Sequence, residues 1–403
     1  HEEMIRKVID FSNAKNNKGL KKTLANSTDF QKMYASLSKD SAIRLFVNPR
    51  AWDSKIKSGK NLNKQEQMIA GFWKKCRSIS VGLQMKEGVV IEGVLLWNQS
   101  GLSTPSSQQW AQFLKATNQQ TSLLNRIPAS AIVVACGRFD GMVFKQIYES
   151  ITTEKERNQL KPQYAMAQSL LLELDPFDDL LANLGSNWGA WIQPTQDQNA
   201  KSFWVDALFA TNLNNPRSTS KRKKDIPDAL ENLTITGLNG LTVLYNSQLK
   251  ENTKRATLHR KKQGETIVRW VETSTFYQVA VGISPKLLLI SNSPRLIEQF
   301  VTSAKLENRS LLIDSERFKK WSTKYFKESK ELFYVDVVAL RQLMKSKETS
   351  LKERLKKKNG ITSSDVDKRF DQIQEVLMTS DIFFLAIHYL EDGVQIKIGA
   401  VAE

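Results

Sequence analysis

The chain has 403 residues and a formal net charge of +17, with 40% apolar and 25% charged residues. This length exceeds what one hydrophobic core usually serves, and the composition is that of a globular protein, so two or three packed units are expected and a disordered or fibrous chain is excluded. The charge predicts attraction to acidic partners, and the longest apolar stretches are too short to form a membrane helix.

The first residues, HEEMIRKVIDF, show no initiating Met, no basic region and no apolar run of a signal peptide. We therefore expect any signal or anchor to lie upstream of His1. The segment resembles SPRLIEQFVTSA at 293–304, a predicted helix with Ser293 as its cap and Pro294 in its first turn. Because that helix follows a predicted sheet, we expect a homologous sheet before His1.

The next segments alternate between helical and strand periodicity. Apolar residues at helical spacing over 30–37 predict an amphipathic helix, and IRLFV at 43–47 predicts a strand. The run 76–97 predicts a β-hairpin whose short charged loop ends at Gly88, where the turn needs a positive φ.

The middle of the chain predicts a strand at 130–139, a helix from about Met142, and a hairpin over 188–212 with a longer polar loop. Beyond it, LTITGLNGLTVLYN, ETIVRWVET and FYQVAVGISPKLLLISNS predict an antiparallel meander, with GLNG at 237–240 as a turn. The helix at 293–304 follows this meander.

The C-terminal part repeats the opening pattern. Residues 318–325 predict an amphipathic helix, 331–336 a strand and 381–401 a hairpin. The Lys-rich stretch 345–372 reads as helical and lies between them.

An internal repeat connects these parts. Placing Phe30 on Phe318 aligns residues 26–52 with 314–340 without a gap and gives seven identities. The hairpins match at an offset of 305, so the later copy holds 17 extra residues. A more diverged copy begins at 130–139, and such self-similarity takes precedence over local motifs.

The sequence therefore predicts an α+β protein of repeated helix-strand-helix-β-hairpin units with an antiparallel meander sheet in the middle. We expect a first unit over 1–105, truncated at its N-terminal side, a second over 128–292 with the extended sheet, and a third over 293–403.

Three stretches carry a resemblance to a known family. FDDLLANLGSNWGAWIQP (177–194), FYQVAVGISPKLLLISNSPRLIEQF and strands of the ELFYVDVVAL type resemble a family of large exported bacterial proteins that is classed only as a domain of unknown function. The resemblance implies an α+β repeat protein behind a signal peptide or an N-terminal membrane anchor. It implies no catalytic residues.

No motif predicts catalysis, a cofactor or a metal. The chain has three histidines, its Ser-x-x-Lys patterns occur as often as chance gives, and it has no phosphate-binding glycine loop. Cys76 and Cys136 show no metal-ligand spacing and are expected to be buried. Asp175, Asp178 and Asp179 are interpreted as favourable charges at a helix start.

Aromatic and basic residues are the remaining candidates. Trp188 and Trp191 would suit stacking if exposed, but strand alternation puts them on opposite faces, so at least one belongs to the core. The basic tracts read as solvated loops and faces or as contacts for an anionic surface. Their candidate contact residues are Lys221, Arg222, Lys223, Lys224, Arg260, Lys261, Lys262, Lys356, Lys357 and Lys358.

These patterns favour a non-enzymatic binding or structural protein of the bacterial cell envelope, exported to the periplasm or cell surface, with an anionic envelope polymer or membrane surface as partner. No small-molecule ligand is predicted. One alternative is an intracellular nucleic-acid-associated protein, which the lack of aromatic residues among the basic tracts disfavours. Another is an enzyme or carrier whose cleft between sheet and helices no motif reveals.

Overall fold

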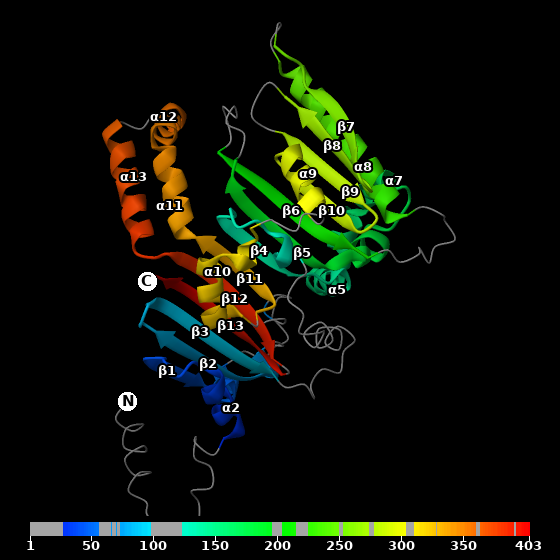
Figure 1. Cartoon of the computed structure of the whole chain (residues 1–403). Helices are drawn as coiled ribbons and strands as arrows, with labels where there is room; N and C mark the ends of the chain where they lie inside the picture. The colour runs from blue at the N-terminus through cyan, green and yellow to red at the C-terminus, as the bar shows by residue number, and fades with distance from the viewer. Residues whose placement is uncertain are drawn as a thin grey trace, which may run out of the picture.

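The computed structural model describes residues 27–55, 66, 70, 73–97, 123–195, 204–214, 225–249, 253–273, 278–303, 310–327, 329–359, 363–390 and 392–403. Within these ranges the protein is α+β and is built on one antiparallel sheet (Figure 1).

Thirteen strands pair in the order β1-β2-β3-β13-β12-β11-β4-β5-β6-β10-β9-β8-β7, and every pairing is antiparallel. The strands are β1 (Ile43–Val47), β2 (Cys76–Gln84), β3 (Gly88–Trp97), β4 (Val133–Arg138), β5 (Leu184–Pro194), β6 (Val205–Leu213), β7 (Thr257–Gln263), β8 (Thr266–Glu272), β9 (Val279–Ser284), β10 (Leu287–Ser291), β11 (Glu331–Asp336), β12 (Ile382–Leu390) and β13 (Gly393–Val401).

The helices lie between these strands in the chain. They are α2 (Thr28–Ser36), α5 (Gly141–Ile151), α6 (Glu154–Gln159), α7 (Lys161–Leu170), α8 (Ile226–Ser247), α9 (Pro294–Ser303), α10 (Glu316–Trp321), α11 (Val337–Ser346), α12 (Glu348–Asn359) and α13 (Ser363–Met378). Short helical turns include η5 (Leu124–Arg126), η6 (Pro176–Leu180), η8 (Leu312–Asp314) and η9 (Ser322–Phe326). No helix in the described part of the chain has the length and apolar character needed to cross a membrane.

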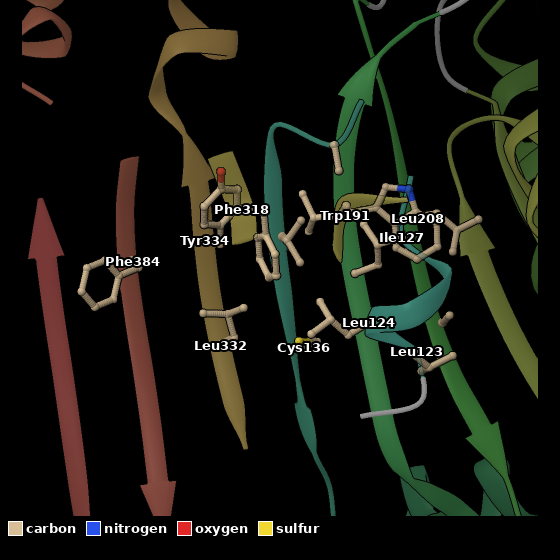
Figure 2. Packing of buried hydrophobic residues seen from close by; sticks show 14 of the residues in the cluster. Leu123, Leu124, Ile127, Cys136, Trp191, Leu208, Phe318, Leu332, Tyr334 and Phe384 are labelled. Atoms are coloured by element: carbon tan, nitrogen blue, oxygen red, sulfur yellow. The ribbon is translucent and has the colours of Figure 1, made fainter. Parts of the chain in front are cut away.

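The main core lies on one face of the sheet, under α9, α10 and the turns η5, η8 and η9. Figure 2 shows part of it as side chains from β12, β11, β4, β5 and β6 that meet those of η5 and α10. Phe384 and Ile297 are fully buried there, and Trp321 is 1% exposed. A continuous apolar layer of this kind is what stabilises a sheet too wide to be held by one helix.

The opposite face is covered by α8 along β7, β8 and β9, while α9 contacts β8 and β9 from the first face. Neighbouring residues of β9 show this alternation directly. Gly282 faces Ile297 of α9, whereas Ile283 packs in a second cluster with Ala229 and Leu230 of α8. Side chains of a strand point alternately to the two faces, so this part of the sheet lies between two helical layers.

The predicted hairpins form as β2 with β3, β5 with β6 and β12 with β13. Gly88 has a φ of 131° at the end of its loop, as predicted. The predicted helices at 30–37 and 293–304 are confirmed as α2 and α9.

One segment of the predicted meander is wrong. LTITGLNGLTVLYN is not a strand pair with a turn at 237–240 but lies inside α8, which buries Ile226, Ala229, Leu230 and Leu238 on one face. Thr, Ile and Val favour strands and two glycines suggest a turn, yet packing of this face on the sheet outweighs a cost of about 1 kcal/mol per helical glycine. The edge strand next to β8 is instead β7, which comes from the basic run 254–262.

Candidate anion-binding cleft

The predicted basic contacts are not gathered into one patch. Lys221, Arg222, Lys223 and Lys224 lie outside the described residues. Of Lys356, Lys357 and Lys358, which belong to α12, only the backbone is described. Arg260, Lys261 and Lys262 are exposed on the edge strand β7. Strand β7 lies seven positions along the sheet from β11, the strand that leads into α11 and α12 (Figure 1), so these two tracts cannot bind one small ligand together.

The edge position gives the β7 cations a structural role. Lys261 Nζ lies 2.8 Å from Glu298 Oε1 of α9, whereas among the described residues no carboxylate pairs with Arg260 or Lys262. Charged side chains on an edge strand oppose pairing with another chain. This role explains the basic residues of β7 without a bound ligand.

The two candidate tryptophans lie on opposite faces of β5, as predicted. Trp191 is 2% exposed and packs on Phe300 of α9, so it is not an exposed aromatic contact. Trp188 is half-buried and stacks on Phe209 of β6 with ring centroids 6.4 Å apart. The pair therefore forms no common stacking platform.

The acidic cluster behaves as the sequence indicates. Asp175 accepts hydrogen bonds from the backbone N–H groups of Phe177 and Asp178 and so caps η6. Within the described ranges no group of three or more His, Cys, Asp or Glu side chains is placed to hold a metal ion. Cys76 and Cys136 are buried, as predicted, and are not joined by a disulfide; burial raises the pKa of the Cys76 thiol.

A cationic cleft forms from residues that belong to no recognisable sequence motif. It has a volume of about 190 Å³ and is lined by three lysines, Lys324, Lys327 and Lys397, with Tyr325, His388 and Gln395 among its other walls. Among the described residues that line it, none is acidic. We call this set the lysine cleft.

The fold explains how these distant residues meet. In the turn η9, Tyr325 and Phe326 pack onto Phe384 of β12, with ring centroids 5.2 and 5.5 Å apart. This packing fixes the turn above the sheet. His388 and Gln395 are register partners in β12 and β13, and Lys397 is two residues further along β13 on the same face.

A buried carboxylate anchors the floor of the lysine cleft. Glu92 of β3 is 1% exposed and accepts hydrogen bonds from the Ser38 backbone N–H at 2.7 Å and from Gln395 Nε2 at 2.8 Å. It also forms an ion pair with Lys397, whose Nζ lies 3.2 Å from Oε1. A buried charge is tolerated only when it is paired and hydrogen-bonded in this way. Glu92 therefore orients Lys397 and Gln395.

A second carboxylate steadies the rim. Glu87 Oε2 lies 2.5 Å from Lys324 Nζ and accepts a hydrogen bond from the Tyr325 hydroxyl at 3.2 Å. The hydrogen bond with Lys324 holds the pKa of Glu87 below its ordinary value, and the same bond raises the pKa of Lys324. Lys324 therefore stays protonated at neutral pH and acts as a fixed positive charge rather than as a base.

The chemistry available in the lysine cleft is electrostatic. Ammonium and amide N–H groups are donors, and they suit phosphate, sulfate or carboxylate oxygens. Its members are spread from Lys324 to Lys397, so only the hairpin register and the packing of η9 bring them together.

Comparisons with protein-family models, with curated proteins and with solved structures found no match.

Proposed function

We propose that this protein is a non-enzymatic binding or structural component of the bacterial cell envelope that engages anionic polymer or membrane surface through the lysine cleft. The observation that carries the proposal is a cleft lined by three lysines, two of which, Lys324 and Lys397, are held in place by Glu87 and Glu92. With a net charge of +17 over the chain, the surrounding field also attracts anions. Export rests on the resemblance of 177–194 and the strands that follow it to exported bacterial proteins.

The proposal includes the repeat of the first and third units. At an offset of 288, Ser27 and Ser315 each cap a helix by accepting a hydrogen bond, from the Phe30 and Phe318 backbone N–H groups respectively. The buried positions Met33 of α2 and Leu37, its C-cap, correspond in the same way to Trp321 and Tyr325. Strands β1 and β11 also start 288 positions apart. Equal caps and equal buried positions support a duplication.

The pairing of β3 with β13 then gives the two copies an approximate two-fold axis. Gly88 pairs with Val401 and Leu96 with Gly393, and Gly393 lies 305 positions after Gly88. At the centre of this register Glu92 pairs with Lys397, its own counterpart in the repeat. On this proposal the lysine cleft arose beside the junction of two copies, where the later copy holds Lys in place of Glu.

Binding to defined anionic probes tests the proposed function. We would measure binding of the protein to polyphosphate, and to vesicles of phosphatidylglycerol with phosphatidylcholine against phosphatidylcholine alone. The double variant K324Q/K327Q should weaken binding to the anionic probe by at least about tenfold, since each lysine near an anionic surface contributes roughly 1 kcal/mol.

The matched control is K155Q/K161Q, which removes the same charge from exposed positions of α6 and α7. It should change binding by about twofold or less. Equal losses in both variants would show that net charge alone attracts the probe and that the lysine cleft is not the site. Tighter binding to duplex DNA than to polyphosphate at equal salt would instead favour the nucleic-acid alternative.

A further inference from the structure

A second cavity lies on the core face of the sheet, between the segment after η5, strand β5 and helix α9. Its volume is about 240 Å³, and its walls include Arg126, Trp191, Gln193, Leu296 and Phe300. Ser130 and Ser310 are exposed and stand at its mouth. None of the described residues in its lining carries a carboxylate.

The cavity walls hold polar groups that the described residues do not satisfy. Gln193 is 2% exposed, and its Oε1 takes a hydrogen bond from Ser130 Oγ at 3.5 Å, while none of the described residues accepts from its Nε2. The indole Nε1 of Trp191 and the Nε of Arg126 are buried without a hydrogen-bond partner among the described residues. Figure 2 shows the Trp191 nitrogen at the end of the ring away from Leu123 and Leu124. Each unpaired buried donor costs roughly 1–3 kcal/mol.

The guanidinium of Arg126 supplies the charge. It lies over the Phe300 ring, 3.9 Å from the centroid, and Nη2 donates to the Phe300 carbonyl at 3.0 Å. No described carboxylate pairs with it, and burial lowers its pKa without an opposing acidic neighbour. An arginine in this setting is still charged at neutral pH, because its ordinary pKa lies far above neutral pH.

We propose that this cavity is a binding site for a small organic carboxylate. The carboxylate would accept from the Arg126 fork and from Gln193 Nε2, since a planar guanidinium matches the two oxygens of a carboxylate. The apolar body of the ligand would lie against Leu296, Phe300 and the face of Trp191. The volume suits a ligand with a single ring or a short chain, because it lies below the roughly 300–1,000 Å³ of sites for drug-sized ligands.

This site is separate from the lysine cleft and does not depend on the proposed function. The lysine cleft is formed by η9, β12 and β13 and presents three ammonium groups, whereas the second cavity presents one arginine, two amides and aromatic walls. The two sites therefore select different anions: extended polyanions at the lysine cleft and a compact carboxylate with an apolar body here.

Calorimetric titration with benzoate, with its neutral isostere benzamide and with inorganic phosphate tests the proposal. We expect saturable 1:1 binding of benzoate, at least about tenfold weaker binding of benzamide and no binding of phosphate at this site. Trp191 lines the cavity, so benzoate should also change the tryptophan fluorescence. Benzamide binding equal to benzoate binding would overturn a carboxylate site.

Substitutions of the lining residues test whether benzoate binds in this cavity. R126Q and Q193L should each weaken benzoate binding by at least about tenfold, while R295Q, which removes the same charge from an exposed position of α9 next to Leu296, should change it by about twofold or less. Unchanged binding in a folded R126Q protein would overturn the proposal. If R126Q does not fold, Q193L with unchanged thermal midpoint and unchanged benzoate affinity would overturn it equally.

Discussion

The two ends of the sheet differ in how many faces the helices cover. Around β8, β9 and β10 the sheet lies between α9 and α8, and residues of both faces are buried. Around β3 and β13 only the face under α2, α10 and η9 is covered by described elements. On the other face Val89 and Ile91 are 48% and 46% exposed, and Ile396 and Ile398 are 37% and 38% exposed.

This difference shows that an apolar strand sequence determines which side chains can be buried, but not which of them the fold buries. The run VVIEGVLLW of β3 is apolar on both faces, as in strands that lie between two layers. Which faces are buried depends on where the connecting helices lie. Helix α8 follows β6 and covers one face of the sheet, while α9 follows β10 and covers the face that carries the main core. One-sided strands depend on a single core layer, and three predictions test that dependence.

The largest effect is expected for Phe384→Ala. Phe384 is fully buried in the single core layer of β12, between Tyr325 and Phe326, and its ring edge fills the space above Gly399. Loss of the ring should cost about 3–5 kcal/mol in the free energy of unfolding. Chemical denaturation followed by far-UV circular dichroism measures it. A loss below about 1 kcal/mol would mean that this part of the sheet does not depend on that layer.

An intermediate effect is expected from Glu331, a carboxyl on the less covered face of β11. Burial raises its pKa, while the hydrogen bond from the Tyr389 hydroxyl lowers it in part. Because the folded-state pKa is raised, the contribution of Glu331 to stability is fully present below the ordinary glutamate pKa of about 4.3 and is lost as the pH rises through the folded value.

Glu331→Gln should therefore raise the thermal midpoint at neutral pH and flatten the pH profile above the acidic range. Tyr389→Phe removes the bond that favours the ionised carboxyl and should move the loss of stability to higher pH. Thermal melts over a pH series measure both variants. A Glu331→Gln profile parallel to that of the parent protein would contradict the assignment.

The smallest effect is expected for Ile398→Thr. Ile398 is 38% exposed and pairs with Ile91 on the less covered face. Its replacement should change the free energy of unfolding by only about 0.5 kcal/mol and reduce the binding of a hydrophobic dye. The matched variant Ile297→Thr, at a fully buried position of α9, should cost about 2 kcal/mol or more. Equal losses would show that both faces are equally covered.

The sequence by itself determined the local elements. Period-two runs with glycine-ended loops gave the hairpins of β2 with β3 and β12 with β13, and helical spacing gave α2 and α9. It also predicted the opposite faces of Trp188 and Trp191 and the burial of Cys76 and Cys136. These features depend on neighbours within one turn or one strand, where periodicity is informative.

Tertiary structure decided the rest. Whether 226–247 is helix or strand depended on a face of the sheet that it could bury, because its own residues favour both states. The lysine cleft required Lys324 and Lys397 to meet, and the second cavity required Arg126, Gln193 and Phe300. Those distances follow from strand order and helix packing between segments far apart in the chain, so no local pattern of residues could contain them.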